Sequence, residues 1–117
     1  MMNFDDYQDK THKLFLIDVE TYKVENDNRD LVISRLALGL TEEAGEIAGK
    51  VKKYLRGDYD FEELKKQVSK EAGDQLWYLN EVLSTLDLKL SDIAQENLDK
   101  LADRRKRGVI LGSGDSR

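Results

Sequence analysis

The sequence predicts an all-α protein with four helices in a bundle-like arrangement. Apolar residues recur at spacings of three and four through most of the 117 residues, whereas no segment alternates apolar and polar residues as a half-buried strand would. Proline is absent and the eight glycines are scattered, so nothing resembles a linker between domains. We therefore expect a single domain over residues 1–111, followed by a disordered tail at residues 112–117.

The first two predicted helices are delimited by polar residues and glycine. The first runs over about residues 4–24, with Asn3 as its N-cap and its C-terminal boundary near residues 26–28. The second begins around Arg29 and ends before Gly57, because glycine favours the left-handed conformation that closes many helices.

The last two predicted helices have their own start signals. Asp60 followed three residues later by Glu63 forms a capping-box pattern, so the third helix begins there and continues to about Leu86. The fourth starts after Ser91, a plausible N-cap, and frays into Gly108.

Connection lengths predict how these helices pack. The second and third helices, and the third and fourth, are joined by short connections, which favour antiparallel neighbours. The middle of the second helix would then face the middle of the third. Four short helices bury a limited core, so we expect a homo-oligomer, either a dimer or a tetramer.

Composition narrows the classes of function. Cysteine is absent, which excludes disulfides, thiolate nucleophiles and zinc–thiolate sites. The formal net charge of -5 argues against a protein that coats nucleic acid. No apolar run is long enough to span a bilayer and the N-terminus lacks a signal-peptide pattern, so we expect no membrane partner and a cytoplasmic location.

The most informative pattern is a repeated quartet, Glu-Ala-Gly-Glu at residues 43–46 and Glu-Ala-Gly-Asp at residues 71–74. On a helix, residues three positions apart share one face, so each quartet projects two carboxylates in the same direction. Two such pairs facing each other repel unless a cation lies between them. The pattern predicts a metal site, and the alternative is an ordinary solvated acidic face.

Three details favour the metal site. Glu42 adds a carboxylate beside the first pair, and core-type residues flank both quartets. Glycine inside a helix costs about 1 kcal/mol relative to alanine, so Gly45 and Gly73 predict close approach of another backbone or of a ligand. The single histidine, His12, lies outside both quartets, so the Glu-x-x-His ligands of a di-iron bundle are missing. Carboxylates alone favour Mg²⁺, with Mn²⁺ as the alternative.

Three segments, residues 38–46, 71–79 and 97–104, together resemble the MazG family of all-α nucleoside triphosphate pyrophosphohydrolases. The family pattern places Glu-x-x-Glu on one helix and Glu-x-x-Asp on the next, and the chain fills it with Glu43, Glu46, Glu71 and Asp74. The resemblance implies a MazG-type fold and a Mg²⁺-dependent enzyme. Such an enzyme cleaves a nucleoside triphosphate between its α- and β-phosphates, releasing a nucleoside monophosphate and pyrophosphate.

Residue roles follow as hypotheses. The four acids of the family pattern would hold the metal. The catalytic candidates are Glu42 and Glu43, and Glu42 is either a further ligand or the base that orients the attacking water. Nucleotide contacts are expected from Lys53, Asn97, Lys100 and Arg104. Trp77 would stack on a base and Asn80 would read a base edge, although a large aromatic at helical spacing is more often core or subunit interface. The alternative function is a non-catalytic helical interaction protein.

Overall fold

A computed structural model describes the backbone of residues 1–21 and 29–117, and the side chains of residues 1–14 and 29–117. Within those ranges the chain is all-α, as predicted. It forms four helices, α1 (Phe4–Thr21), α2 (Arg29–Leu55), α3 (Phe61–Thr85) and α4 (Leu90–Arg107). The predicted end of the first helix, at residue 24 with its boundary near 26–28, lies outside the described residues. None of the helices that the structure describes combines the length and the apolar character needed to cross a membrane.

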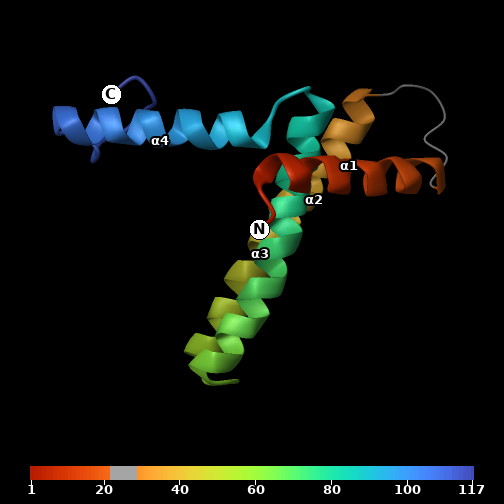
Figure 1. Cartoon of the computed structure of the whole chain (residues 1–117). Helices are drawn as coiled ribbons and strands as arrows, with labels where there is room; N and C mark the ends of the chain where they lie inside the picture. The colour runs from red at the N-terminus through yellow and green to blue at the C-terminus, as the bar shows by residue number, and fades with distance from the viewer. Residues whose placement is uncertain (22–28) are drawn as a thin grey trace.

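The helices form two arms (Figure 1). α2 and α3 pack side by side along one arm, α1 crosses the C-terminal end of α3, and α4 extends away as the second arm. Residues late in α2 lie beside residues early in α3, as in the Tyr54–Phe61 ring pair at 6.0 Å, so the predicted antiparallel packing of these two helices is confirmed.

The predicted antiparallel packing of the third and fourth helices is wrong. At the end of α3, Asp87 adopts a left-handed conformation with φ 57°, which turns the chain outward. Gln8 of α1 then fastens the turn, because its amide donates to the Leu88 carbonyl at 2.8 Å and accepts from the Leu90 backbone N–H at 3.0 Å. The start of α4 is thereby attached to α1, and its remaining length projects away from α3 (Figure 1).

Most predicted helix ends are confirmed by capping geometry. The Asn3 side chain accepts from the Asp6 backbone N–H at 2.8 Å, and the Asp60 side chain accepts from the Glu63 backbone N–H at 2.8 Å. Gly108 closes α4 with φ 72°, a conformation that side-chain-bearing residues adopt with strain. After Gly108, residues 112–117, for which the sequence predicts disorder, turn back along the end of α4 (Figure 1).

Ser91 is not the cap of the fourth helix. α4 begins at Leu90 with Lys89 in the N-cap position, and no side chain caps it there. The Ser91 hydroxyl instead donates to the Asp5 carboxylate of α1 at 2.7 Å. A tertiary contact thus takes the hydroxyl that local capping would have used.

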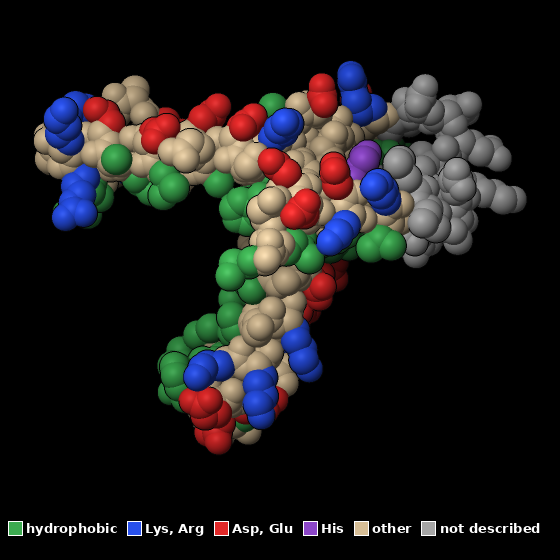
Figure 2. All heavy atoms as spheres, viewed as in Figure 1, with side chains coloured by type: hydrophobic (Ala, Val, Ile, Leu, Met, Phe, Trp, Pro, Cys, Tyr) green, Lys and Arg blue, Asp and Glu red, His purple; other side chains and the backbone are tan. Residues whose placement is uncertain are grey.

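The core of the described residues is small. Only Leu36, Leu83 and Leu90 are buried apolar side chains among them. At the crossing of α1 and α3 the buried groups are polar: the Asn80 amide donates to the Thr11 hydroxyl at 2.5 Å and to the Glu81 carboxylate at 3.2 Å. Many apolar side chains stay exposed, and Figure 2 shows them gathered on the facing sides of the two arms.

Close packing between α2 and α3 depends on Gly39. A Cβ at this position would lie far closer to the nearest carbon of the Tyr78 ring than the van der Waals contact distance of two carbon atoms. The absence of a side chain at Gly39 therefore lets the ring lie directly against the α2 backbone. This contact fixes how far α3 can slide along α2.

We predict that Gly39→Ala destabilises the fold by about 1–3 kcal/mol, because overpacking against Tyr78 outweighs the better helix propensity of alanine. Urea unfolding at fixed protein concentration measures the change. Gly49→Ala in the same helix is the matched control, since nothing lies within 4 Å of its Cβ position. It should stabilise the protein by up to about 1 kcal/mol. Equal effects of the two substitutions would contradict the assigned contact.

Candidate metal centre

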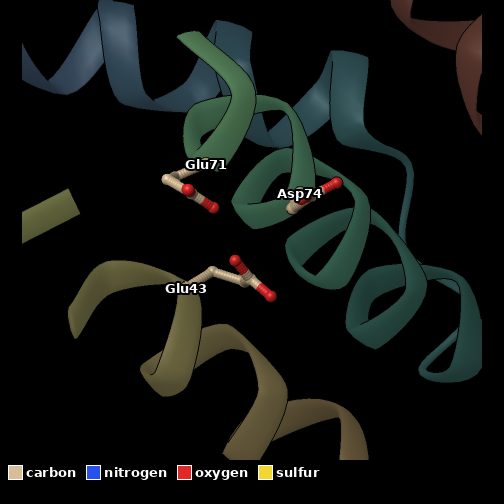
Figure 3. Close-up of side chains that lie close together, drawn as sticks. All are labelled: Glu43, Glu71 and Asp74. Carbon is tan, nitrogen blue, oxygen red and sulfur yellow. The ribbon is translucent and has the colours of Figure 1, made fainter. Parts of the chain in front are cut away.

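Three carboxylates from α2 and α3 lie close together (Figure 3). Glu43 of α2 faces Glu71 and Asp74 of α3, and one oxygen from each lies within 4.8 Å of the others. Glu71 and Asp74 project together because they stand three residues apart on one helix, and the antiparallel packing brings Glu43 opposite them. The sequence-based expectation that the two quartets face each other is met by these three residues.

The geometry suits a hard divalent cation. Carboxylate oxygens are the ligands that Mg²⁺ and Mn²⁺ prefer, and three acids on two helices leave further coordination positions for water or phosphate oxygens. No thiolate or imidazole belongs to the group. The donor set therefore fits the predicted class of metal.

Glu42 and Glu46 lie beside this group without joining it. Both side chains are exposed, and neither contributes to the three-carboxylate group. Their charges nevertheless act on the site. The pKa of Glu43 is raised, first by burial and then by the negative charges of Asp74, Glu71, Glu42 and Glu46. A cation between the acids would relieve this repulsion. The roles predicted for Glu42 and Glu46 stay predictions.

Lys50 is a charged residue of the site that the sequence analysis did not identify. Its ammonium lies 3.2 Å from the Glu71 carboxylate, and both side chains are mostly buried, at 19% and 16% exposed. Lys50 stands seven residues after Glu43, two helical turns along the same face of α2, so helical spacing alone could have pointed to it. The chain thus supplies one positive charge to its own acidic group.

Tyr78 is a second neighbour of the acids. The pKa of its phenol is raised, mainly by burial and then by Glu43, Glu42 and Asp74. Its ring meets Trp77 edge to face, with centroids 5.0 Å apart. Trp77 is half-buried in this aromatic pair. Its predicted stacking on a base stays a prediction.

At Gly45 and Gly73 the predicted close approach of another backbone does not occur within the described chain, while close approach of a ligand stays a prediction. No described atom outside the helix's own backbone comes within 4 Å of a Cβ built at either position. In α2 the close approach occurs at Gly39 instead, because Gly39 faces Tyr78. The sequence could not rank the three glycines, since each sits in a helical pattern.

Asn80 requires a correction. Its side chain is completely buried, with 0% exposure, and its amide donates to Thr11 and Glu81. The group holds α1 against α3 and cannot reach a base edge in this structure. The sequence pattern was ambiguous because a polar residue at a buried helix position is indistinguishable from one in a binding site.

The remaining predicted nucleotide contacts lie outside the acidic group. Lys53 is exposed in the last turn of α2. Asn97, Lys100 and Arg104 belong to α4, which extends away from α2 and α3 (Figure 1). Lys100 and Arg104 instead meet Asp115 of the C-terminal segment. Within one chain, the structure separates the predicted phosphate contacts from the predicted metal ligands.

Comparisons with known proteins address the same part of the chain. The family model of the MazG nucleotide pyrophosphohydrolase domain matches residues 33–109, which include all three converging acids. The "Gene 37 protein" of Mycobacterium phage L5 is 48% identical over 88 residues, covering 73% of this chain and 76% of that protein. Its name states no activity. No solved structure matches significantly.

We predict that Mg²⁺ or Mn²⁺ raises the melting temperature, because an ion bound only by the folded protein stabilises it by mass action. At one hundred times the Kd the stabilisation is about 2.7 kcal/mol. Differential scanning fluorimetry with increasing metal concentration measures the shift. Glu43→Gln should remove most of it, whereas Glu62→Gln on α3, whose exposed carboxylate pairs with Lys65, should leave it intact. An equal shift in both variants would argue against metal binding at the three acids.

Proposed function

Since this chain belongs to the MazG nucleotide pyrophosphohydrolase domain family, we propose that it is a Mg²⁺-dependent nucleoside triphosphate pyrophosphohydrolase. It cleaves (d)NTPs between the α- and β-phosphates to a nucleoside monophosphate and pyrophosphate, with Mn²⁺ as an alternative metal. The observation that carries the proposal is the convergence of Glu43, Glu71 and Asp74 from two helices within the matched region. We place the activity in the cytoplasm, in nucleotide-pool control or house-cleaning.

The acidic group supplies the residues that such a reaction needs. Glu43, Glu71 and Asp74 would hold the cation, and Glu46, one turn beyond Glu43 with an exposed side chain, would complete the set. A bound Mg²⁺ neutralises charge on phosphate oxygens. Glu42, exposed beside Glu43, would accept a proton from the attacking water, and Glu43 is the second candidate.

Cations are also needed for the leaving pyrophosphate. Lys50 already lies within the acidic group, 3.2 Å from Glu71. With a metal held by the acids, the Lys50 ammonium would be available to a phosphate oxygen of the substrate. Lys53, Asn97, Lys100 and Arg104 are the further phosphate contacts that we propose, with Trp77 on the base.

We predict that the protein with Mg²⁺ releases pyrophosphate from nucleoside triphosphates, and that Asp74→Asn lowers kcat about 100-fold or more, because the acids lose a metal ligand. A panel of canonical and modified nucleotides, with pyrophosphate and orthophosphate measured separately, tests both statements. Glu62→Gln is the matched control on α3 and should keep full activity. Orthophosphate without pyrophosphate would refute the proposed bond cleavage.

The open shape supports a homo-oligomer. Three buried apolar side chains are few for the described part of the chain, and Leu98 and Leu101 of α4 are 62% and 41% exposed. On the other arm, Leu40, Leu76 and Leu79 help to line an apolar groove of about 580 Å³ between α2 and α3. A second copy covering these surfaces would bury them. The last turn of α4 carries four cations and α2 and α3 carry the acidic group, so attraction between these charges would add to the effect of burying apolar surface.

We therefore propose that α4 of one copy serves the acidic group of another. Mixing two inactive variants tests this arrangement, Glu43→Gln with Arg104→Gln. In a randomly mixed dimer half of the molecules carry one complete site, so about a quarter of the wild-type activity should return. If both groups act within one chain, no mixed dimer has a complete site and the mixture stays inactive. Size-exclusion chromatography of each variant checks that both assemble.

A further inference from the structure

The C-terminal segment places a carboxylate between two cations of α4. The Lys100 ammonium lies 3.3 Å from one Asp115 carboxylate oxygen, and the Arg104 guanidinium lies 3.1 Å from the same oxygen. Arg104 also donates to the Asp115 backbone carbonyl at 2.9 Å. These bonds, Arg104 first and then Lys100, lower the pKa of Asp115. Lys100 and Arg104 thus form a pair that binds an anion.

The buried position of the Arg104 side chain is suited to binding an anion. Its side chain is only 5% exposed, whereas arginine on a helix surface usually keeps its guanidinium in water. Among the described residues, its buried Nε has no hydrogen-bond partner. A guanidinium donates its N–H groups best to an anion that presents two oxygens side by side. A phosphate group offers more such acceptors than the single Asp115 carboxylate oxygen used here.

The segment that carries Asp115 has a defined turn. Gly108 ends α4, and Gly112 with φ 135° helps to reverse the chain. The Arg107 guanidinium then donates to the Arg117 backbone carbonyl at 2.9 Å, while the Arg117 side chain donates to the Ile110 carbonyl at 3.3 Å. Residues 109–117 consequently form a small loop, the C-terminal loop, bound to the last turns of α4.

We propose that the C-terminal loop is an internal competitor of the nucleotide, in which the Asp115 carboxylate occupies the place of a phosphate group between Lys100 and Arg104. The inference rests on the proposed function and adds that the C-terminal loop regulates how tightly the nucleotide binds. A triphosphate must displace the loop before it can use these two cations.

The contact between Asp115 and the two cations is weak, so a nucleotide can displace it easily. Asp115 is 88% exposed, and ion pairs with a solvated member change an equilibrium constant by about fivefold or less. A triphosphate brings several negative charges and more acceptor oxygens, so it outcompetes one carboxylate. The loop should raise the apparent KM and leave kcat nearly unchanged.

The test compares two single substitutions in the full-length chain. Asp115→Asn removes the charge but keeps the backbone carbonyl that Arg104 uses, and it should lower the KM for the nucleotide about two- to fivefold with kcat unchanged. Asp103→Asn is the matched control, because Asp103 is an exposed acid of α4 that pairs with Arg107 at 2.8 Å. It should leave KM at the wild-type value.

A binding measurement separates failure of the inference from failure of the proposed function. Inorganic pyrophosphate titrated by calorimetry should bind about two- to fivefold more tightly to Asp115→Asn than to wild type, whether or not the protein hydrolyses nucleotides. Unchanged affinity and KM in Asp115→Asn, or equal changes in both variants, would overturn the competitor role. Absence of pyrophosphate release by the wild type would overturn only the proposed reaction.

Discussion

The packing of the Tyr78 ring against Gly39 is the contact on which the rest of the structure depends. It sets the register of α3 along α2, and that register places Glu43 opposite Glu71 and Asp74. Side chains repeat on a helix face only every three or four residues. A slip of one residue would therefore turn one of the acids away from the other two. The site is built by a steric contact one to two turns away from it, without any bond between the acids themselves.

The same register brings several carboxylates of α2 and α3 together, and only part of their negative charge is neutralised by a nearby cation. Lys50 pairs with Glu71, and the pKa of Glu43 is raised first by its burial and then by four neighbouring carboxylates. For Glu43, ionisation is harder in the folded state than in the unfolded state. The repulsion is therefore fully relieved below the ordinary carboxyl pKa of 4.5 and grows as pH rises through the raised value. The same repulsion would favour the cation that we propose to bind there near neutral pH.

The second arm follows from a different constraint. Gln8 uses its amide to satisfy the backbone at the α3–α4 turn, and the left-handed Asp87 directs α4 outward. An 18-residue helix with one apolar side and few contacts is marginal in isolation. Its apolar side stays exposed at Leu98 and Leu101, and we propose that the α2–α3 arm of a second copy covers it. At the α1–α3 crossing, the buried Asn80 amide donates to Thr11 and the buried Glu81 carboxylate lies 3.4 Å from the His12 ring, so these contacts hold α1 against α3.

The sequence by itself determined the all-α class, the positions of most helix ends and a set of four acids expected to face one another, because helical periodicity, capping and the i, i+3 rule act over a few residues. Tertiary structure brings three of them together, Glu43, Glu71 and Asp74. The family that the sequence resembles is confirmed by the match over residues 33–109, whereas the four metal ligands that the resemblance implies stay predictions. Tertiary structure decided which glycine is needed, that Asn80 is buried, that Lys50 joins the acids and that α4 turns away from α3. These features depend on contacts between residues distant in sequence. Periodicity states which face of a helix is apolar or charged, whereas only the packed structure determines what that face meets.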